Sequence, residues 1–298
     1  LKRVSRSLVV IGGGVIGVEY ATIFSALDVK VTIIEPNEIL FAFLDRELVD
    51  EFIHDMRDRG MSIRLQSRVK RVSRQGEACL IELEDSRQIW SEMVLFAAGR
   101  KGATDALELE NCGLTADDRG KIDVDRNTFR TRQPHIHAVG DVIGWPSLAD
   151  TSIVQGRLAA LNALKMRVES FPKIFPFGIY TIPEISYVGI TEEEAKARDY
   201  KIVIGRCRYS ELPRGQISGE CEGMLKMIVH ADTREILGVH ILGGGATEVI
   251  HIAQMALIHN AKIDIFLDNI FNYPTYSEAL KIAAFSALNK IRNTHIQS

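Results

Sequence analysis

The fold is decided by the stretch Leu8-Val9-Val10-Ile11-Gly12-Gly13-Gly14-Val15-Ile16-Gly17-Val18-Glu19. Its four apolar residues predict a buried strand, and the glycines at 12, 14 and 17 fit the pattern G-x-G-x-x-G. A helical spacing of apolar residues follows, and a second apolar strand over 29–34 ends in Glu35. Together these features predict the strand–turn–helix–strand unit that binds a dinucleotide.

Each of the three glycines has a separate role in that unit. Gly12 permits the tight turn, Gly14 lets the backbone approach a pyrophosphate, and Gly17 lets the helix pack on the strand. The helix N-terminus then presents free N–H groups and the positive end of a dipole to the phosphates. The alternative is a glycine-rich turn that binds nothing, which the flanking strands and the carboxylate at position 35 disfavour.

Glu35 indicates which dinucleotide the site prefers. A carboxylate at this position can accept hydrogen bonds from both ribose hydroxyls of an adenosine, and it repels a 2′-phosphate. The residues that follow are Pro36, Asn37 and Glu38, so no arginine comes close behind it. We therefore expect NADH to bind more tightly than NADPH, with NADP as a second nucleotide to be tested.

Length and composition are those of a globular protein of about two domains. The chain has 298 residues, of which 46% are hydrophobic and 25% charged. A net charge of −3 gives no reason to expect a nucleic acid or a membrane surface as partner, and no apolar run approaches the roughly 20 residues of a membrane helix. The four cysteines form no metal-ligand pattern, so we expect no metal site and a reducing, cytoplasmic location.

The order of predicted elements indicates an α/β fold class. After the first unit the sequence predicts a helix, short strands and a hairpin, and then a buried strand over 93–98 that ends in Gly99. A boundary is expected near Pro172, and from Gly178 the pattern becomes rich in β-strands. The other expected elements are a short strand within 135–141, a helix over 151–168, a hairpin of strands at 223–230 and 236–242, and helices over 246–259 and 277–291.

Three further motifs resemble the pyridine nucleotide–disulfide oxidoreductase family, and the resemblance covers the whole chain. They are Phe96-Ala97-Ala98-Gly99-Arg100, then Ala138-Val139-Gly140-Asp141, and then Gly178 to Ser186 at the start of the β-rich part. The resemblance implies a homodimer. It also implies three parts: a Rossmann-like NAD-binding domain at 1–115, the C-terminal part of an FAD-binding domain at 116–172, and an α+β dimerisation domain at 173–298.

The resemblance also implies residues for a flavin site. Asp141 would hydrogen-bond the ribityl chain of FAD, with capping of the next turn as the alternative role. Leu148-Ala149-Asp150 would lie beside the flavin, and the helix that follows would aim its N-terminus at the ring. Members of the family begin with a flavin-binding segment that carries its own glycine motif and would precede Leu1. We therefore expect the FAD site to be incomplete in this chain, and FAD to bind weakly or not at all.

Three more residues match family positions around the nicotinamide nucleotide. Glu19 matches the family carboxylate near the nicotinamide ring, and a helix-surface position is the alternative. Val69 and Gly99 match positions that pack on the adenosine and nicotinamide portions, and ordinary strand packing is the alternative for both.

The segment Asn272-Tyr273-Pro274-Thr275, with Glu278, narrows the resemblance. Disulfide-using members carry His-Pro there, and a Glu orients that acid/base histidine. This chain has Tyr273, which is a poor base at neutral pH, so we expect Tyr273 and Glu278 to have a structural role at the dimer interface. The tyrosine variant is similar to the family's soluble pyridine nucleotide transhydrogenases, which have no redox disulfide.

Three functions follow from these observations. The leading hypothesis is flavin-dependent hydride transfer between pyridine nucleotides, in which the flavin performs the chemistry and the protein supplies binding and alignment. Glu35 favours an NAD-specific oxidoreductase similar to dihydrolipoamide dehydrogenase as the first alternative, because a transhydrogenase must also accept the 2′-phosphate of NADP. The second alternative is a non-catalytic fragment that binds NAD and dimerises.

Overall fold

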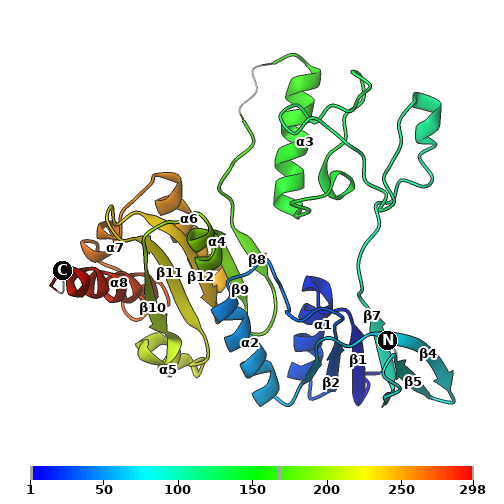
Figure 1. The fold of residues 1–298 in the computed structure, drawn as a ribbon, viewed down its shortest axis with the longest axis horizontal. Coiled ribbons are helices and arrows are strands. Elements are labelled where there is room, and N and C mark those ends of the chain that lie inside the picture. The colour runs from blue at the N-terminus through cyan, green and yellow to red at the C-terminus, as the bar shows by residue number, and fades with distance from the viewer. Residues whose placement is uncertain (1–2, 167–169, 297–298) are drawn as a thin grey trace. The chain divides into compact units, whose positions relative to one another are not determined.

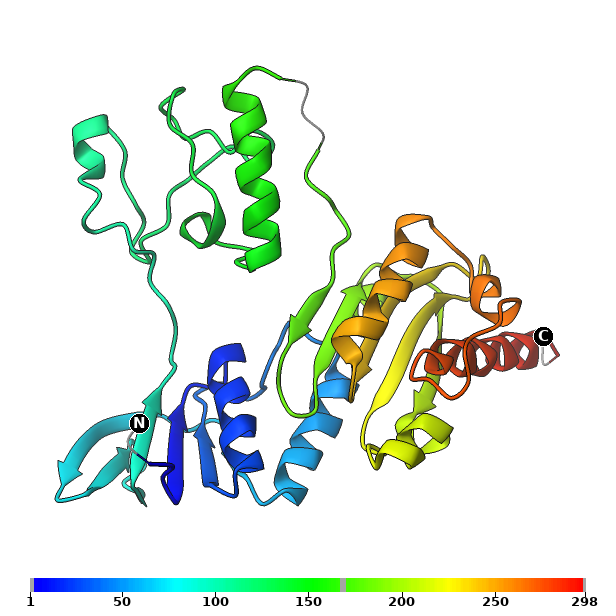
Figure 2. The ribbon, with the colours of Figure 1, turned by 180° about the vertical axis from the view of Figure 1, so that it is seen from behind.

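The computed structural model describes residues 3–166 and 170–296, which form two compact units. Unit 1 combines Leu1–Ala98 with Ile174–Ser298, and unit 2 is Gly99–Lys173. Both units appear in Figure 1, and Figure 2 shows them from behind. The predicted α/β fold class is confirmed. The domain boundaries expected at 115 and 172 stay predictions, because the two units are defined only by which parts of this chain pack together.

The N-terminal half of unit 1 is built on a parallel sheet with the strand order β3-β2-β1-β7. Strand β1 pairs with β2 and β7, and Leu8 to Ile11 are buried, as expected for a strand covered on both faces. Helix α1 packs against β1 and β2 (Figure 1). The elements are β1 (Ser7–Ile11), α1 (Val15–Ala26), β2 (Lys30–Ile34), α2 (Arg46–Asp58), β3 (Ser62–Arg64) and β7 (Met93–Phe96).

An antiparallel sheet of three strands packs against this parallel sheet. It contains the expected hairpin and consists of β4 (Val69–Gln75), β5 (Ala78–Leu83) and β6 (Gln88–Ser91). The hydrophobic cluster between the two sheets consists of Val9, Ile11, Ile34, Ile81 and Leu83. Because successive side chains of a strand point to opposite faces, Val10 of β1 points toward α1 instead.

The C-terminal half of unit 1 is an antiparallel sheet with the strand order β10-β11-β12-β9-β8. Leu225, Met227 and Val229 of β11 lie in the main hydrophobic core with residues of α6 and α8. Alternation along the strand places Lys226 and Ile228 on the opposite face. Helix α6 packs on β9 and β12, and helix α8 packs on β10 and β11, as Figure 2 shows.

The elements of this half include the expected hairpin and both expected helices. The strands are β8 (Phe177–Ile179), β9 (Ile185–Gly189), β10 (Ile202–Arg208), β11 (Met224–His230) and β12 (Ile236–Leu242). The α-helices are α4 (Glu192–Ala197), α5 (Pro213–Ser218), α6 (Ala246–Ile258), α7 (Asp264–Leu267) and α8 (Glu278–Ile296), and the 3-10 helix η3 spans Tyr209–Glu211.

Unit 2 differs from the expected elements in two places. It contains the 3-10 helices η1 (Leu109–Cys112) and η2 (Gly140–Ile143) and the helix α3 (Ala149–Ala163). The helix expected over 151–168 thus begins earlier and ends at Ala163, where Lys165 adopts a φ of +55°; residues 167 and 168 lie outside the described range. The strand expected within 135–141 is wrong, because His137 forms only an isolated bridge before the chain turns into η2.

Over residues 3–166 and 170–296, no helix combines the length and the apolar character that crossing a bilayer requires.

Candidate nucleotide-binding site

The turn between β1 and α1 leaves no room for a side chain at Gly12 or Gly17 and little room at Gly13. Gly12 has a φ of +107°, and a Cβ there would lie 2.5 Å from the carbonyl oxygen of Ala97. A Cβ at Gly17 would lie 2.2 Å from the carbonyl oxygen of Gly12, so α1 approaches β1 as closely as backbone allows. Gly13 was not predicted from the motif, and a Cβ there would lie 2.3 Å from Cδ2 of Leu40.

Gly14 is different, because it faces open space at the start of α1. It is the N-cap residue with φ −75° and ψ 174°, and no side chain caps the helix. A Cβ at Gly14 would meet no atom of the described residues within 4 Å. The N–H groups of a first helical turn have no partner within the helix. They can therefore bind a phosphate, with the helix dipole adding attraction.

Glu35 lies directly beside this turn and is 7% exposed. Its Oε2 accepts a hydrogen bond from the backbone N–H of Gly13 at 2.6 Å. Its Oε1 accepts hydrogen bonds from Asn37, from the backbone N at 2.9 Å and from the side-chain Nδ2 at 2.6 Å. The carboxylate is therefore fixed between the glycine turn and the loop that follows β2, at the end of the strand where a ribose would lie.

Glu19 and Thr22 attach α1 to the C-terminal half of unit 1. Oε1 of Glu19 accepts a hydrogen bond from the backbone N–H of Tyr180 at 2.8 Å. Oγ1 of Thr22 accepts one from the backbone N–H of Ile182 at 3.1 Å. Glu19 thus has a structural partner on one oxygen, and its role near a nicotinamide stays a prediction.

Val69 and Gly99 have different surroundings. Val69 is half-buried at the start of β4 and packs against the cluster between the two sheets, which is the strand-packing role named as its alternative. Gly99 is exposed, has a φ of +136° and begins unit 2. The nucleotide-binding roles of both residues stay predictions.

Within unit 2, the Gly140-Asp141 motif forms the start of η2. Gly140 has a φ of +75°, and its N–H donates to Oε1 of the buried Gln155 at 2.7 Å. Asp141 forms an ion pair with Arg100 through Oδ2 and Nη1. This pairing could not be predicted from local sequence, because Arg100 and Asp141 are 41 positions apart.

The other residues expected at a flavin lie at the start of α3. Leu148 is the N-cap residue, no side chain caps the helix, and Ala149 and Asp150 are its exposed first residues. The first-turn N–H groups of α3 therefore remain available to a ligand atom of negative charge.

The hydrogen bonds and ion pairs of the described residues do not link Tyr273 to Glu278 as an acid/base pair. Tyr273 is 72% exposed. Oε2 of Glu278 accepts a hydrogen bond from the backbone N–H of Thr275 at 3.2 Å, at the start of α8. Glu278 thus binds the backbone here, and the expected role at a dimer interface stays a prediction.

A set of charged side chains, which we call the Lys226 cluster, joins the two halves of unit 1. Its members are Lys226, Asp45, Glu47, Glu192 and Arg206. Nζ of Lys226 lies 2.8 Å from Oδ1 of Asp45 and 2.6 Å from Oε2 of Glu192. Glu47 lies 2.9 Å from the same ammonium and also accepts two hydrogen bonds from Arg206, at 2.6 and 2.7 Å. Lys226 and Asp45 are almost completely buried, with side chains 1% and 0% exposed.

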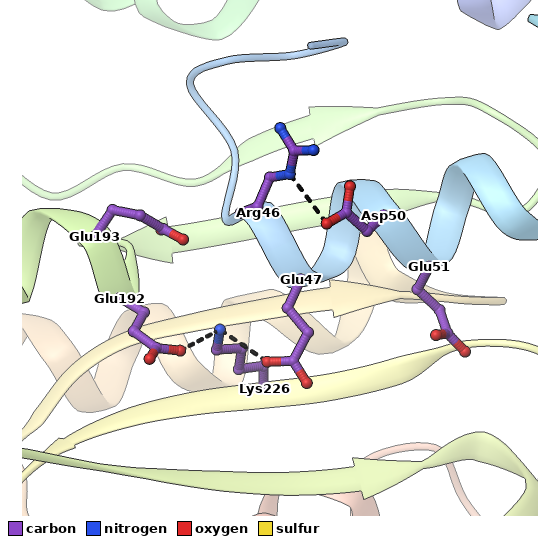
Figure 3. Close-up of a pocket in the computed structure, with 7 residues that line it drawn as sticks. All are labelled: Arg46, Glu47, Asp50, Glu51, Glu192, Glu193 and Lys226. Atoms are coloured by element: carbon purple, nitrogen blue, oxygen red, sulfur yellow. Dashed lines mark hydrogen bonds and ion pairs between the residues drawn. The ribbon is translucent and has the colours of Figure 1, made fainter. Parts of the chain in front are cut away.

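Figure 3 shows the ammonium of Lys226 between Glu47 and Glu192, on the wall of a pocket of about 460 Å³. Burial alone would lower the pKa of Lys226, but its hydrogen bonds to the three carboxylates raise the pKa above the ordinary value. In the described part of the chain, no group of three His, Cys, Asp or Glu side chains is arranged to hold a metal ion. The ion pairs of the Lys226 cluster connect α2 and the residue before it, Asp45, to α4, β10 and β11.

Stability is expected to fall in acid as Glu47 loses its charge. The hydrogen bond from Arg206 is the main cause that lowers the pKa of Glu47 to about 2, from an ordinary 4.5, and Lys226 lowers it further against the effect of burial. A carboxyl with a lowered native pKa stabilises the fold above pH 4.5, and this contribution disappears as the pH falls from 4.5 to about 2. Urea unfolding between pH 6 and pH 2 should show this loss. The loss should be smaller in Glu47→Gln, and an identical pH profile in that variant would contradict the assignment.

Residues 1–156 match the family described as pyridine nucleotide-disulphide oxidoreductase, and residues 175–284 match the dimerisation domain of the same family. The chain belongs to the pyridine nucleotide-disulphide oxidoreductase family. The glycine turn, Glu35 and the Gly140-Asp141 motif all lie within the first match.

Two groups of known proteins are similar to this chain. Soluble pyridine nucleotide transhydrogenases from Mycobacterium bovis (strain BCG / Pasteur 1173P2) and Marinobacter nauticus are 44% and 41% identical, over 98% of this chain and 62% and 63% of theirs. The HOCl-induced flavoprotein disulfide reductase RclA from Escherichia coli is 31% identical with a TM-score of 0.91, over 96% of this chain and 66% of that chain. The chain thus spans less than two thirds of the length of these proteins.

Membership of this family implies the use of FAD and of a pyridine nucleotide. The residues present fit the nucleotide, because Gly14 leaves space at an uncapped helix and Glu35 is fixed beside it. They also fit the ribityl and ring portions of a flavin, because Asp141 is exposed with only one carboxylate oxygen paired to Arg100, and α3 has no side-chain cap.

Proposed function

We propose that unit 1 binds a pyridine dinucleotide at the turn between β1 and α1, with a preference for NADH. The proposal rests on the carboxylate of Glu35, whose Oε2 accepts a hydrogen bond from the N–H of Gly13 at 2.6 Å and lies beside the uncapped start of α1. Pyrophosphate oxygens would accept hydrogen bonds from the first turn of α1. Glu35 would accept a hydrogen bond from the adenosine ribose and repel a 2′-phosphate. Glu19 would face the nicotinamide end through its second oxygen.

We further propose that the full-length protein transfers hydride between pyridine nucleotides. The names of the relatives that are 41–44% identical support this reaction. Bound flavin would supply the hydride acceptor and donor. This chain would contribute Asp141 to the ribityl chain, and Leu148-Ala149-Asp150 at the start of α3 beside the ring, where the helix dipole favours negative charge. Tyr273 at the family's histidine position disfavours the alternative similar to dihydrolipoamide dehydrogenase.

We also propose a homodimer formed through the C-terminal half of unit 1. The match to the dimerisation domain supports it. So do the exposed apolar side chains of this half, among them Met255 (51% exposed), Ile258 (43%) and Ile270 (96%).

The nucleotide preference can be tested by substitution of Glu35. The chain should bind NADH more tightly than NADPH when each is titrated and followed by nicotinamide fluorescence. In Glu35→Gln, NADH should bind about tenfold more weakly, because a hydrogen bond to a charged group, worth about 1.5–3 kcal/mol, is replaced by one to a neutral amide, worth about 0.5–1.5 kcal/mol. NADPH should bind more tightly than before, because the repulsion is removed.

Glu38→Gln is the matched control. It removes the same charge from an exposed side chain three residues later in the chain, so it should change neither affinity by more than about twofold. Wild-type chain that binds neither nucleotide, or binds NADPH as tightly as NADH, would overturn the proposal.

A further inference from the structure

We infer that Asn37 is a positioning residue that determines nucleotide specificity by locking the carboxylate of Glu35. The inference rests on the proposed nucleotide site. Asn37 donates twice to the same oxygen, Oε1 of Glu35, from its backbone N and from its side-chain Nδ2. Gly13 occupies the other oxygen with one donor. Rotation of the carboxylate would break bonds on both sides, so its place is fixed before any ligand arrives.

The backbone of Asn37 is itself held by the neighbouring loop. Its carbonyl oxygen accepts a hydrogen bond from the N–H of Gln66 at 3.1 Å. The carbonyl of Glu35 accepts one from the N–H of Ser67 at 3.0 Å. The loops that follow β2 and β3 are therefore joined at this point, and the side-chain amide of Asn37 reaches Glu35 from a fixed base.

The hydrogen-bond count shows which oxygen remains for a ligand. A carboxylate has about four acceptor positions, and protein donors fill two on Oε1 and one on Oε2. The remaining position is on Oε2, the oxygen beside the glycine turn. Glu35 would thus offer one acceptor to the adenosine ribose, where the sequence analysis expected a carboxylate that accepts from both hydroxyls.

The fixed position of the Glu35 carboxylate is what would make it repel the 2′-phosphate of NADPH effectively. A free glutamate could turn its charge toward solvent when a 2′-phosphate enters, and much of the repulsion would disappear. A carboxylate held by Asn37 and Gly13 cannot turn away without losing charge-assisted hydrogen bonds. Asn37 thus acts through Glu35, and removal of its amide should reduce discrimination although no charge changes.

The test is a set of titrations with NADH and NADPH on the full chain. Asn37→Ala removes the side-chain donor and keeps the backbone N–H on Oε1. The ratio of the NADPH Kd to the NADH Kd should therefore fall by about three- to fivefold, through weaker NADH binding and tighter NADPH binding. Asn37→Leu keeps the size of the side chain but has no donor, and should behave in the same way. Asn37 is exposed and its backbone N–H stays bonded to Glu35, so both variants should stay folded and melt within about 5 °C of wild type.

A double-mutant cycle with Glu35→Gln separates positioning from a general effect. In the Glu35→Gln background, Asn37→Ala should change the Kd ratio by less than about twofold. The inference is overturned if wild type prefers NADH but Asn37→Ala leaves the ratio unchanged. It is also overturned if the ratio changes equally in both backgrounds. Failure of the wild-type chain to bind either nucleotide would instead overturn the proposed function, so the two failures are distinguishable.

Discussion

Replacement of Lys226 by methionine is expected to lower the free energy of unfolding by about 3–5 kcal/mol. Lys226 is 1% exposed, and its ammonium is the partner of Asp45, Glu47 and Glu192. Methionine removes that positive charge and leaves Asp45, which is completely buried, with backbone donors alone. The loss of one partner of a buried ion pair is far more costly than the loss of an exposed pair.

Lys196→Met provides the matched control for that experiment. Lys196 forms an ion pair with the same Glu192, at 2.6 Å, but its side chain is 65% exposed. We expect its replacement to change the free energy of unfolding by less than about 1 kcal/mol. Urea unfolding of the two variants should therefore differ by several kcal/mol. Equal and small effects would show that the Lys226 cluster contributes little to the attachment of α2 to the C-terminal sheet.

The Lys226 cluster also shows what sequence reasoning could not reach. A lysine between Leu225 and Met227 in an alternating strand indicates a residue on the face away from the core. Nothing in that pattern identifies its main partner, Asp45, because the two are 181 positions apart. The ion pairs depend on how the two halves of unit 1 pack, and that packing is a tertiary property that local patterns do not carry.

The nucleotide turn was predictable for the opposite reason. Its strand, turn and helix are contiguous, and steric limits at Gly12 and Gly17 act between neighbouring segments, so local spacing contains the information. Gly13 was missed because the motif leaves that position open, whereas here Leu40 closes the space around it. The end of α3 was misplaced because apolar periodicity continues after Ala163 although the helix does not.

Gly14→Ala and Gly17→Ala are expected to separate binding from folding at this turn. A methyl group at Gly14 meets no described atom within 4 Å, and φ is −75°, so the fold should lose less than about 1 kcal/mol. The same methyl group would occupy the space through which a pyrophosphate approaches the first turn of α1. NADH should therefore bind about 10- to 100-fold more weakly, which corresponds to the loss of a charge-assisted hydrogen bond worth about 1.5–3 kcal/mol.

Gly17→Ala should show the opposite order of effects. Its Cβ would lie 2.2 Å from the carbonyl oxygen of Gly12 and 3.1 Å from Cγ1 of Val10, so α1 must move away from β1. Overpacking of this kind costs about 1–3 kcal/mol of stability, and the displaced helix should bind NADH poorly as a consequence. Thermal unfolding and NADH titration of both variants give the comparison. Unchanged NADH affinity in a stably folded Gly14→Ala chain would mean that the pyrophosphate does not approach α1 at Gly14, because a ligand that passes elsewhere would not meet the added methyl group.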